Sequence, residues 1–207
     1  MKKVIAIFFK MFLIILMFYG LFQLLNYNYK NCVLNFGKKI TYQIIQKNEA
    51  NNKKLILNKS IEYIIKNIKY DENSSYSWYK PLSKTWVEKS GVCLNQTELL
   101  ASLLLSHNIK SNIVIGYLDG LPHAWLEVND NNLGYLILDI TYIQKLYESK
   151  QIKDLNEIFN HDYNLYCVEC NYQKDSIATN LKGAYFLIYR RYPILSEFWD
   201  KLKESPL

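Results

Sequence analysis

The sequence predicts an α+β fold in which a helix that carries a cysteine packs on an antiparallel sheet. Apolar residues recur at helical spacing up to about residue 107, and strand-like runs follow from residue 111. These runs are separated by short polar loops, which is typical of strands joined as hairpins. A block of helices followed by a block of strands is the arrangement of an α+β domain.

Two helices are predicted from apolar periodicity. The first has one apolar face at i, i+3, i+4 and i+7 spacing, formed by Ile61, Ile64, Ile65 and Ile68. The second begins near Cys93, and its apolar face holds Leu99, Leu100, Leu103 and Leu104. We expect Asn108 to end this helix, because asparagine tolerates the left-handed backbone conformation. His107, in its last turn, is placed as a cap.

Three strands are predicted after these helices. Residues 111–117, 123–128 and 135–141 are rich in β-branched, aromatic and aliphatic residues. Leu118–Pro122 and Asn129–Gly134 supply the turns between them. The three strands therefore form a meander beside the helices.

Residues 1–28 predict an uncleaved N-terminal membrane anchor. Lys2 and Lys3 precede Val4–Phe9, Lys10 follows, and Met11–Leu25 is uncharged. Together these runs approach the length of a membrane-spanning helix if Lys10 reaches the headgroups. The early lysines favour a cytoplasmic N-terminus, with the catalytic domain on the extracytoplasmic side. The alternative is a buried helix of a soluble protein.

The rest of the chain is expected to form one domain after a lead-in. Residues 29–59 are a linker or helical lead-in, and residues 60–207 are the domain, with a core at 60–141 and an extension at 142–207. The net charge is +6, and the anchor supplies three of the 25 basic residues, which leaves 22 against 19 acidic ones. This balance gives no indication of nucleic-acid binding. The sequence also indicates no metal site and no cofactor.

Cys93 has two interpretations, as a small core residue or as a nucleophile. A thiol nucleophile needs a base, and the base works better when a third group orients it. His123 begins one predicted strand, and Asp139 ends the next one sixteen residues later. If the two strands pair as a hairpin, the imidazole and the carboxylate can lie side by side near Cys93. A neighbouring imidazolium and the helix N-terminus would favour a thiolate.

Three motifs in this order resemble the core of the transglutaminase-like superfamily. They are "GVCLNQTELLASLLLSHNIKSNIVIGY", "HAWLEV" and "LILDIT", and the resemblance covers roughly Ser60 to Thr141, including a helix similar to one in bacterial members. It implies a papain-like fold, with Cys93 as nucleophile, His123 as general base and acid, and Asp139 as the residue that orients His123. The chain departs from the family pattern at three positions where the family has Gly, Pro and Pro: Asn108, Lys110 and Ile140.

The resemblance also implies an oxyanion site made by the backbone N–H of Cys93 and an upstream side chain. Tyr70, Trp78 and Trp86 are the candidates, and Trp86 ranks first because it lies nearest to Cys93 in sequence. Separately, Cys167 and Cys170 form a C-x-x-C pair. A local disulfide and two ordinary thiols are equally compatible with that spacing.

The sequence therefore predicts a membrane-anchored, thiol-dependent enzyme that acts on amide bonds of peptides or proteins. Cysteine-type hydrolysis is favoured, because nothing in the chain looks like a domain that holds an acceptor. Two alternatives stay open. One is an amide cross-linking transglutaminase, and the other is a membrane-tethered binding or scaffold module without turnover.

Overall fold

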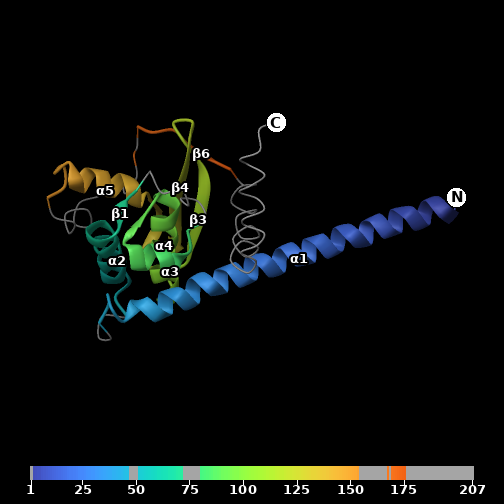
Figure 1. Ribbon diagram of the computed structural model, residues 1–207, viewed down its shortest axis with the longest axis horizontal. Coiled ribbons are helices and arrows are strands. Elements are labelled where there is room, and N and C mark those ends of the chain that lie inside the picture. Colours follow the sequence, from blue (N-terminus) through green and yellow to red (C-terminus); the bar gives the residue numbers. More distant parts are fainter. Residues whose placement is uncertain (1, 47–50, 72–79, 154–166, 168, 176–207) are drawn as a thin grey trace. The chain divides into compact units, whose positions relative to one another are not determined.

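The structure is a computed structural model, shown in Figure 1, that describes residues 2–46, 51–71, 80–153, 167 and 169–175. The chain divides into two units. Cys32–Thr179 form one unit, and the remaining residues form the other. The predicted domain bounds at residues 28 and 59 stay predictions.

A long helix, α1 (Lys2–Thr41), begins the chain. Its large apolar side chains that are described between Ile7 and Leu24 are exposed. Within the described part of the chain, no helix combines the length and apolar content needed to cross a membrane. The last turns of α1 belong to the second unit, where Val33 and Ile40 are buried. A Cβ at Gly37 would overlap the carbonyl oxygen of Ser102, so a glycine is needed for the close approach there.

The described residues of the second unit contain four shorter helices: α2 (Lys53–Asn67), α3 (Leu82–Glu88), α4 (Cys93–Ser106) and α5 (Ile140–Glu148). The predicted apolar face of α2 is buried, as expected. All residues of α4 from Cys93 to Leu104 are buried, which is more than the single apolar face that the sequence predicts. His107 is the C-cap of α4, and Asn108 has a left-handed φ of 58°, so both predictions at this helix end are confirmed.

The main sheet has four antiparallel strands in the order β5-β4-β3-β6. They are β3 (Ser111–Leu118), β4 (Leu121–Asp130), β5 (Gly134–Leu138) and β6 (Tyr172–Lys174). The β3–β4 connection is a two-residue turn, with positive φ at Asp119 (51°) and Gly120 (79°). Both central residues at positive φ are typical of the tight turns that match the twist of a hairpin. The predicted meander is therefore present.

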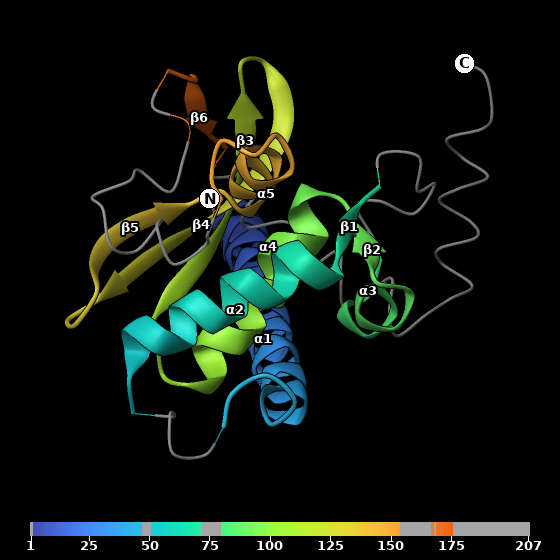
Figure 2. The same cartoon turned by 90° about the vertical axis from the view of Figure 1, so that its left-hand side faces the viewer.

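Helix α4 lies at the centre of the second unit. It packs against β3 and β4 of the sheet and also contacts α2, α3 and α5 (Figure 2). A second sheet consists of two short parallel strands, β1 (Lys69–Tyr70) and β2 (Ser90–Gly91). Strand β2 leads directly into the first turn of α4. This mixture of helices around one antiparallel sheet agrees with the predicted α+β class.

Two features of the sheet differ from the prediction. The third strand ends at Leu138 rather than at Thr141, because Asp139 becomes the N-cap of α5. The Asp139 carboxylate accepts a hydrogen bond from the backbone N–H of Tyr142 at 3.1 Å, which is how an aspartate starts a helix. Strand β6 was not expected, and it pairs with β3 through Gly116, Tyr117 and Leu118.

Candidate active site

Cys93 is the first residue of α4, and a compact turn before it fixes its position. The backbone N–H of Val92 donates to Oδ1 of Asn95 at 3.1 Å, and Nδ2 of Asn95 donates to the carbonyl oxygen of Lys80 at 3.3 Å. A Cβ at Gly91 would lie 2.7 Å from Cβ of Asn95, so only glycine fits beside this folded side chain. As a first-turn group, the N–H of Cys93 has no acceptor within the helix. It can therefore donate to a group bound at the cysteine.

The Cys93 thiol is free and only 5% exposed. It belongs to an apolar cluster with Val92, Leu94, Ile115 and Ala124. These neighbours are what the core-residue interpretation expects. The side chain also interacts with the imidazole of His123, however, which an inert core cysteine does not require.

His123 lies near the start of β4, where it pairs in register with Gly116 of β3. Its Nε2 is 2.8 Å from Oδ2 of Asp139, and its side chain is largely buried. Because Nε2 faces the carboxylate, Nδ1 is the ring nitrogen that can exchange a proton with the Cys93 sulfur. The ring of Trp125 lies nearly parallel to the imidazole, with centroids 6.4 Å apart, and packs beside it.

The environment of His123 favours its charged form. Burial acts to lower the pKa of the imidazole, but its hydrogen-bonding and electrostatic interactions with Asp139 and Cys93 raise it to about 10. An imidazolium is stabilised by a carboxylate on one side and a sulfur on the other. The site therefore holds a proton on His123 at neutral pH.

Asp139 is fully buried, and three donors surround its carboxylate. Oδ1 accepts the backbone N–H of Tyr142, whereas Oδ2 accepts from His123 and from the Tyr172 hydroxyl, each at 2.8 Å. A buried carboxylate requires such partners, since an unpaired charge away from water is strongly unfavourable. The structure thus brings Cys93, His123 and Asp139 together as one line of interacting side chains, in which His123 is hydrogen-bonded to Asp139.

Two polar side chains near the start of α4, Gln96 and Thr97, connect the elements that carry Cys93, His123 and Asp139. Thr97 Oγ1 donates to the carbonyl oxygen of Ala124, the neighbour of His123, at 3.2 Å. Nε2 of Gln96 donates to Oε1 of Gln144, on the helix that Asp139 caps, at 2.6 Å. The sequence offered a signal for both, because "NQT" is a polar run in an otherwise apolar helix.

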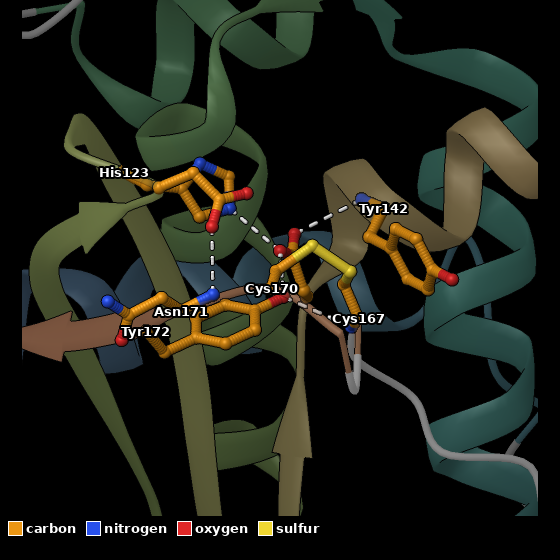
Figure 3. Close-up of a disulfide and its surroundings, with 8 residues drawn as sticks. His123, Tyr142, Cys167, Cys170, Asn171 and Tyr172 are labelled. Carbon is orange, nitrogen blue, oxygen red and sulfur yellow. Dashed lines mark hydrogen bonds and ion pairs between the residues drawn. A yellow bond between two sulfur atoms is a disulfide. The ribbon is translucent and has the colours of Figure 1, made fainter.

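Tyr172 is a further residue of the site that was not predicted from the sequence. It lies on β6, in the predicted extension 142–207, and its ring meets that of Trp125 edge to face at 5.2 Å. Figure 3 shows His123 and Tyr172 approaching the same carboxylate, with the Cys167–Cys170 disulfide beside them. The disulfide interpretation of the C-x-x-C pair is therefore the one that the structure contains.

The three oxyanion candidates have different surroundings. The ring of Trp86 stacks on Tyr63 at 5.1 Å, and the Lys89 ammonium lies 3.9 Å from its centroid. Neither neighbour belongs to the site, and a catalytic role for Trp86 stays a prediction. Tyr70 instead packs against the cluster that contains Cys93, because β1 pairs with β2 just before α4. Trp78 lies outside the described residues.

No group of three His, Cys, Asp or Glu side chains in the described ranges could hold a metal ion. The family model of the transglutaminase-like superfamily matches residues 38–140, which contain Cys93, His123 and Asp139. The match starts upstream of Ser60 and ends just after the aspartate. No curated protein matches the chain. With its cysteine helix, histidine strand and following aspartate in the family order, the chain carries a transglutaminase-like superfamily domain at residues 38–140.

Proposed function

We propose that this protein is a thiol-dependent amide-bond hydrolase that acts on peptides or proteins. One observation carries the proposal: an imidazole lies between a free thiol at a helix N-terminus and a buried carboxylate. Nucleophile, base and orienting group are the three parts that cysteine-type acyl transfer needs. The superfamily match supports chemistry of this type.

In the first half-reaction, the Cys93 thiolate attacks the carbonyl carbon of the amide. The oxyanion that forms accepts a hydrogen bond from the backbone N–H of Cys93, which lies at the positive end of α4. The C–N bond then breaks, and the His123 imidazolium gives its proton to the leaving amine. The raised pKa of His123 suits this step, because the residue enters the reaction already protonated.

In the second half-reaction, neutral His123 takes a proton from water, and the resulting hydroxide attacks the thioester. The C–S bond breaks, Cys93 leaves as a thiolate, and the imidazolium is restored. Asp139 holds the ring in position throughout and stabilises its charge. Hydrolysis is favoured over transfer to an amine, because the β3–β4 turn beside His123 is only two residues long and offers little material to cover an acceptor site.

We propose further that residues 1–28 tether the protein to a membrane, with the catalytic domain on the extracytoplasmic side. The lysine-flanked apolar sequence and the exposed apolar side chains from Ile7 to Leu24 support this proposal. Exposed apolar surfaces of this kind mark membrane or protein contacts. Full-length protein should sediment with membranes and dissolve only in detergent. Recovery of the full chain in the aqueous supernatant after ultracentrifugation would contradict the tether.

The enzymatic proposal is tested with a peptide library and the full chain in detergent, with products identified by mass spectrometry. Cleavage should give free carboxylic acids and disappear in Cys93→Ala, while Cys32→Ala should cleave like the wild type. The same reaction with excess primary amine separates the two enzyme classes. Products that carry mainly the added amine would replace hydrolysis by cross-linking. A folded protein whose Cys93 stays unreactive would favour a binding module.

A further inference from the structure

The segment after the family match supplies a contact to the catalytic line that the superfamily motifs do not include. Residues 38–140 match the family, and Tyr172 lies 33 residues beyond Asp139 on β6. Its hydroxyl donates to Oδ2 of Asp139 at 2.8 Å, the same oxygen that Nε2 of His123 approaches. Burial of the phenol, and then the Asp139 charge, raise the pKa of Tyr172. Tyr172 therefore keeps its hydroxyl proton to a higher pH than an ordinary tyrosine does, and it can donate that proton to Asp139.

Three kinds of contact hold Tyr172 in this position. In β6 it pairs with Leu118 of β3, and its ring packs edge to face on Trp125. Before β6, Asn171 and Asp119 exchange two hydrogen bonds, from Asp119 N–H to the Asn171 carbonyl at 3.1 Å and from Asn171 N–H to Asp119 Oδ1 at 2.9 Å. These contacts fix the backbone on which the phenol is carried.

A fourth contact comes from the disulfide-closed turn. The backbone N–H of Cys167 donates to the Tyr172 hydroxyl oxygen at 3.2 Å, and Cys167 is bonded to Cys170 through the disulfide. The N–H of Cys170 also donates to the carbonyl oxygen of Cys167 at 3.4 Å. Because the hydroxyl oxygen of Tyr172 accepts the N–H of Cys167, the hydroxyl proton is free to point toward Asp139. The turn therefore sets both the place and the direction of the hydroxyl.

We propose that Tyr172 is a positioning residue of this active site, acting through Asp139, and that the Cys167–Cys170 disulfide keeps it in place. The inference rests on the proposed function. His123 and Tyr172 both donate to Oδ2 of Asp139, and a backbone N–H donates to Oδ1. These three hydrogen bonds fix the orientation of the buried carboxylate, and the fixed carboxylate aligns His123 with Cys93. Without the phenol, the carboxylate can rotate, and the His123 ring loses its fixed partner.

The disulfide makes this alignment dependent on redox conditions. A dithiol reductant breaks the S–S bond, gives two thiols at Cys167 and Cys170, and is itself oxidised to a cyclic disulfide. Opening the turn releases the Cys167 N–H from the Tyr172 hydroxyl. Reduction should therefore weaken the active site. This response is opposite to the usual one, in which reductants only protect a catalytic thiol from oxidation.

Tyr172 is tested by the rate at which iodoacetamide labels Cys93 at pH 6, followed by peptide mass spectrometry. Tyr172→Phe keeps the ring on Trp125 and removes only the hydroxyl. It should slow labelling about tenfold, the effect expected from losing one hydrogen bond to a charged group. Tyr135→Phe, an exposed tyrosine on β5, should label like the wild type. In an Asp139→Asn protein, adding Tyr172→Phe should change the labelling rate of Cys93 less than about twofold, because Tyr172 acts through the Asp139 carboxylate.

The outcomes separate positioning from packing. The role of the hydroxyl would be overturned if Cys93 in Tyr172→Phe were labelled at the wild-type rate. It would also be overturned if Tyr172→Phe slowed labelling equally in the wild-type and in the Asp139→Asn protein. The variant Cys167→Ser/Cys170→Ser should slow labelling as Tyr172→Phe does, and dithiol-treated wild type should match it after the reductant is removed. If the double serine variant labels at the wild-type rate, the disulfide does not hold Tyr172. Wild-type Cys93 that labels no faster than Cys32 would instead refute the proposed function itself.

Discussion

Thr97 Oγ1 donates a hydrogen bond to the carbonyl oxygen of Ala124 at 3.2 Å and so joins the helix of Cys93 to the strand of His123. Both residues are fully buried. Thr97 lies one turn after the cysteine, and Ala124 is adjacent to the histidine in sequence. The bond therefore fixes the distance between the thiol and the imidazole more directly than the surrounding apolar contacts, which are not directional.

Thr97→Val should lower both stability and the reactivity of Cys93. The substitution keeps the shape of the side chain and removes the donor, at a cost of about 1–2 kcal/mol in the free energy of unfolding. Cys93 should also label more slowly with iodoacetamide, because α4 can shift along β4. Chemical denaturation and labelling rates measure the two effects.

Thr85→Val is the matched control, since Thr85 is also fully buried but donates within its own segment, to the carbonyl oxygen of Pro81 at 3.3 Å. It should lose similar stability with no change in Cys93 labelling. Equal labelling losses in the two variants would mean that reactivity simply follows stability, and that the Thr97 bond has no special role.

Gly116→Ala should detach β6 from the sheet. A Cβ at this position would overlap the carbonyl oxygen of Gln173 and come within 2.9 Å of the Trp125 ring. Overpacking of this kind costs about 1–3 kcal/mol. Because β6 carries Tyr172, Cys93 labelling should fall to the level of Tyr172→Phe. Thermal unfolding and labelling of the same sample provide the measurement.

Lys174→Ala serves as the control for Gly116, its partner in the β3–β6 register. This substitution removes only the ion pair between Lys174 and Glu127, whose charged atoms are 3.0 Å apart. Because the lysine is half-exposed, such a pair contributes about 0–1 kcal/mol to the free energy of unfolding. Labelling of Cys93 should be unchanged. A Gly116→Ala protein that labels at the wild-type rate would show that β6 does not support the site.

Stability should fall at alkaline pH because of His123. Its pKa is raised from 6.5 to about 10 in the folded state, so the folded protein binds the proton more tightly than the unfolded chain. The resulting stabilisation is complete below about pH 6.5 and is lost as the pH rises through about 10. His123→Asn lacks this group, so the stability difference between wild type and variant should shrink from pH 6.5 to 10. Urea unfolding at several pH values measures it, and a constant difference would contradict an imidazolium in the site.

Much of the fold could be predicted because its signals are local. The isoleucine periodicity of α2, the turn residues of the β3–β4 hairpin and the left-handed Asn108 each depend on a few neighbouring residues. His123 and Asp139 could be paired for the same reason, since a hairpin brings strands together within sixteen residues. The helix start at Asp139 was missed, although an aspartate before "ITY" is itself a capping signal.

The remaining features depend on contacts between distant segments. Strands β1 and β2 have two residues each, too few for any period to show, and yet they place Tyr70 beside the cysteine cluster. Trp86 was ranked by its distance along the chain, whereas in the structure the ring of Trp86 stacks on Tyr63 and contacts the Lys89 ammonium. Tyr172 reaches Asp139 across 33 residues through a three-residue strand. No periodicity encodes such a contact.

The most direct test of the central claim is the alkylation of Cys93 in the full-length protein at pH 6. Cys93 is 5% exposed, and Cys32 is more accessible, so exposure alone predicts that Cys32 reacts first. A thiolate paired with His123 predicts the reverse, because the thiolate is the reactive form. Cys93 should be labelled faster than Cys32 in the wild type and more slowly than Cys32 in His123→Ala. A folded wild type in which Cys32 reacts first, with or without His123, would show that Cys93 is a core residue.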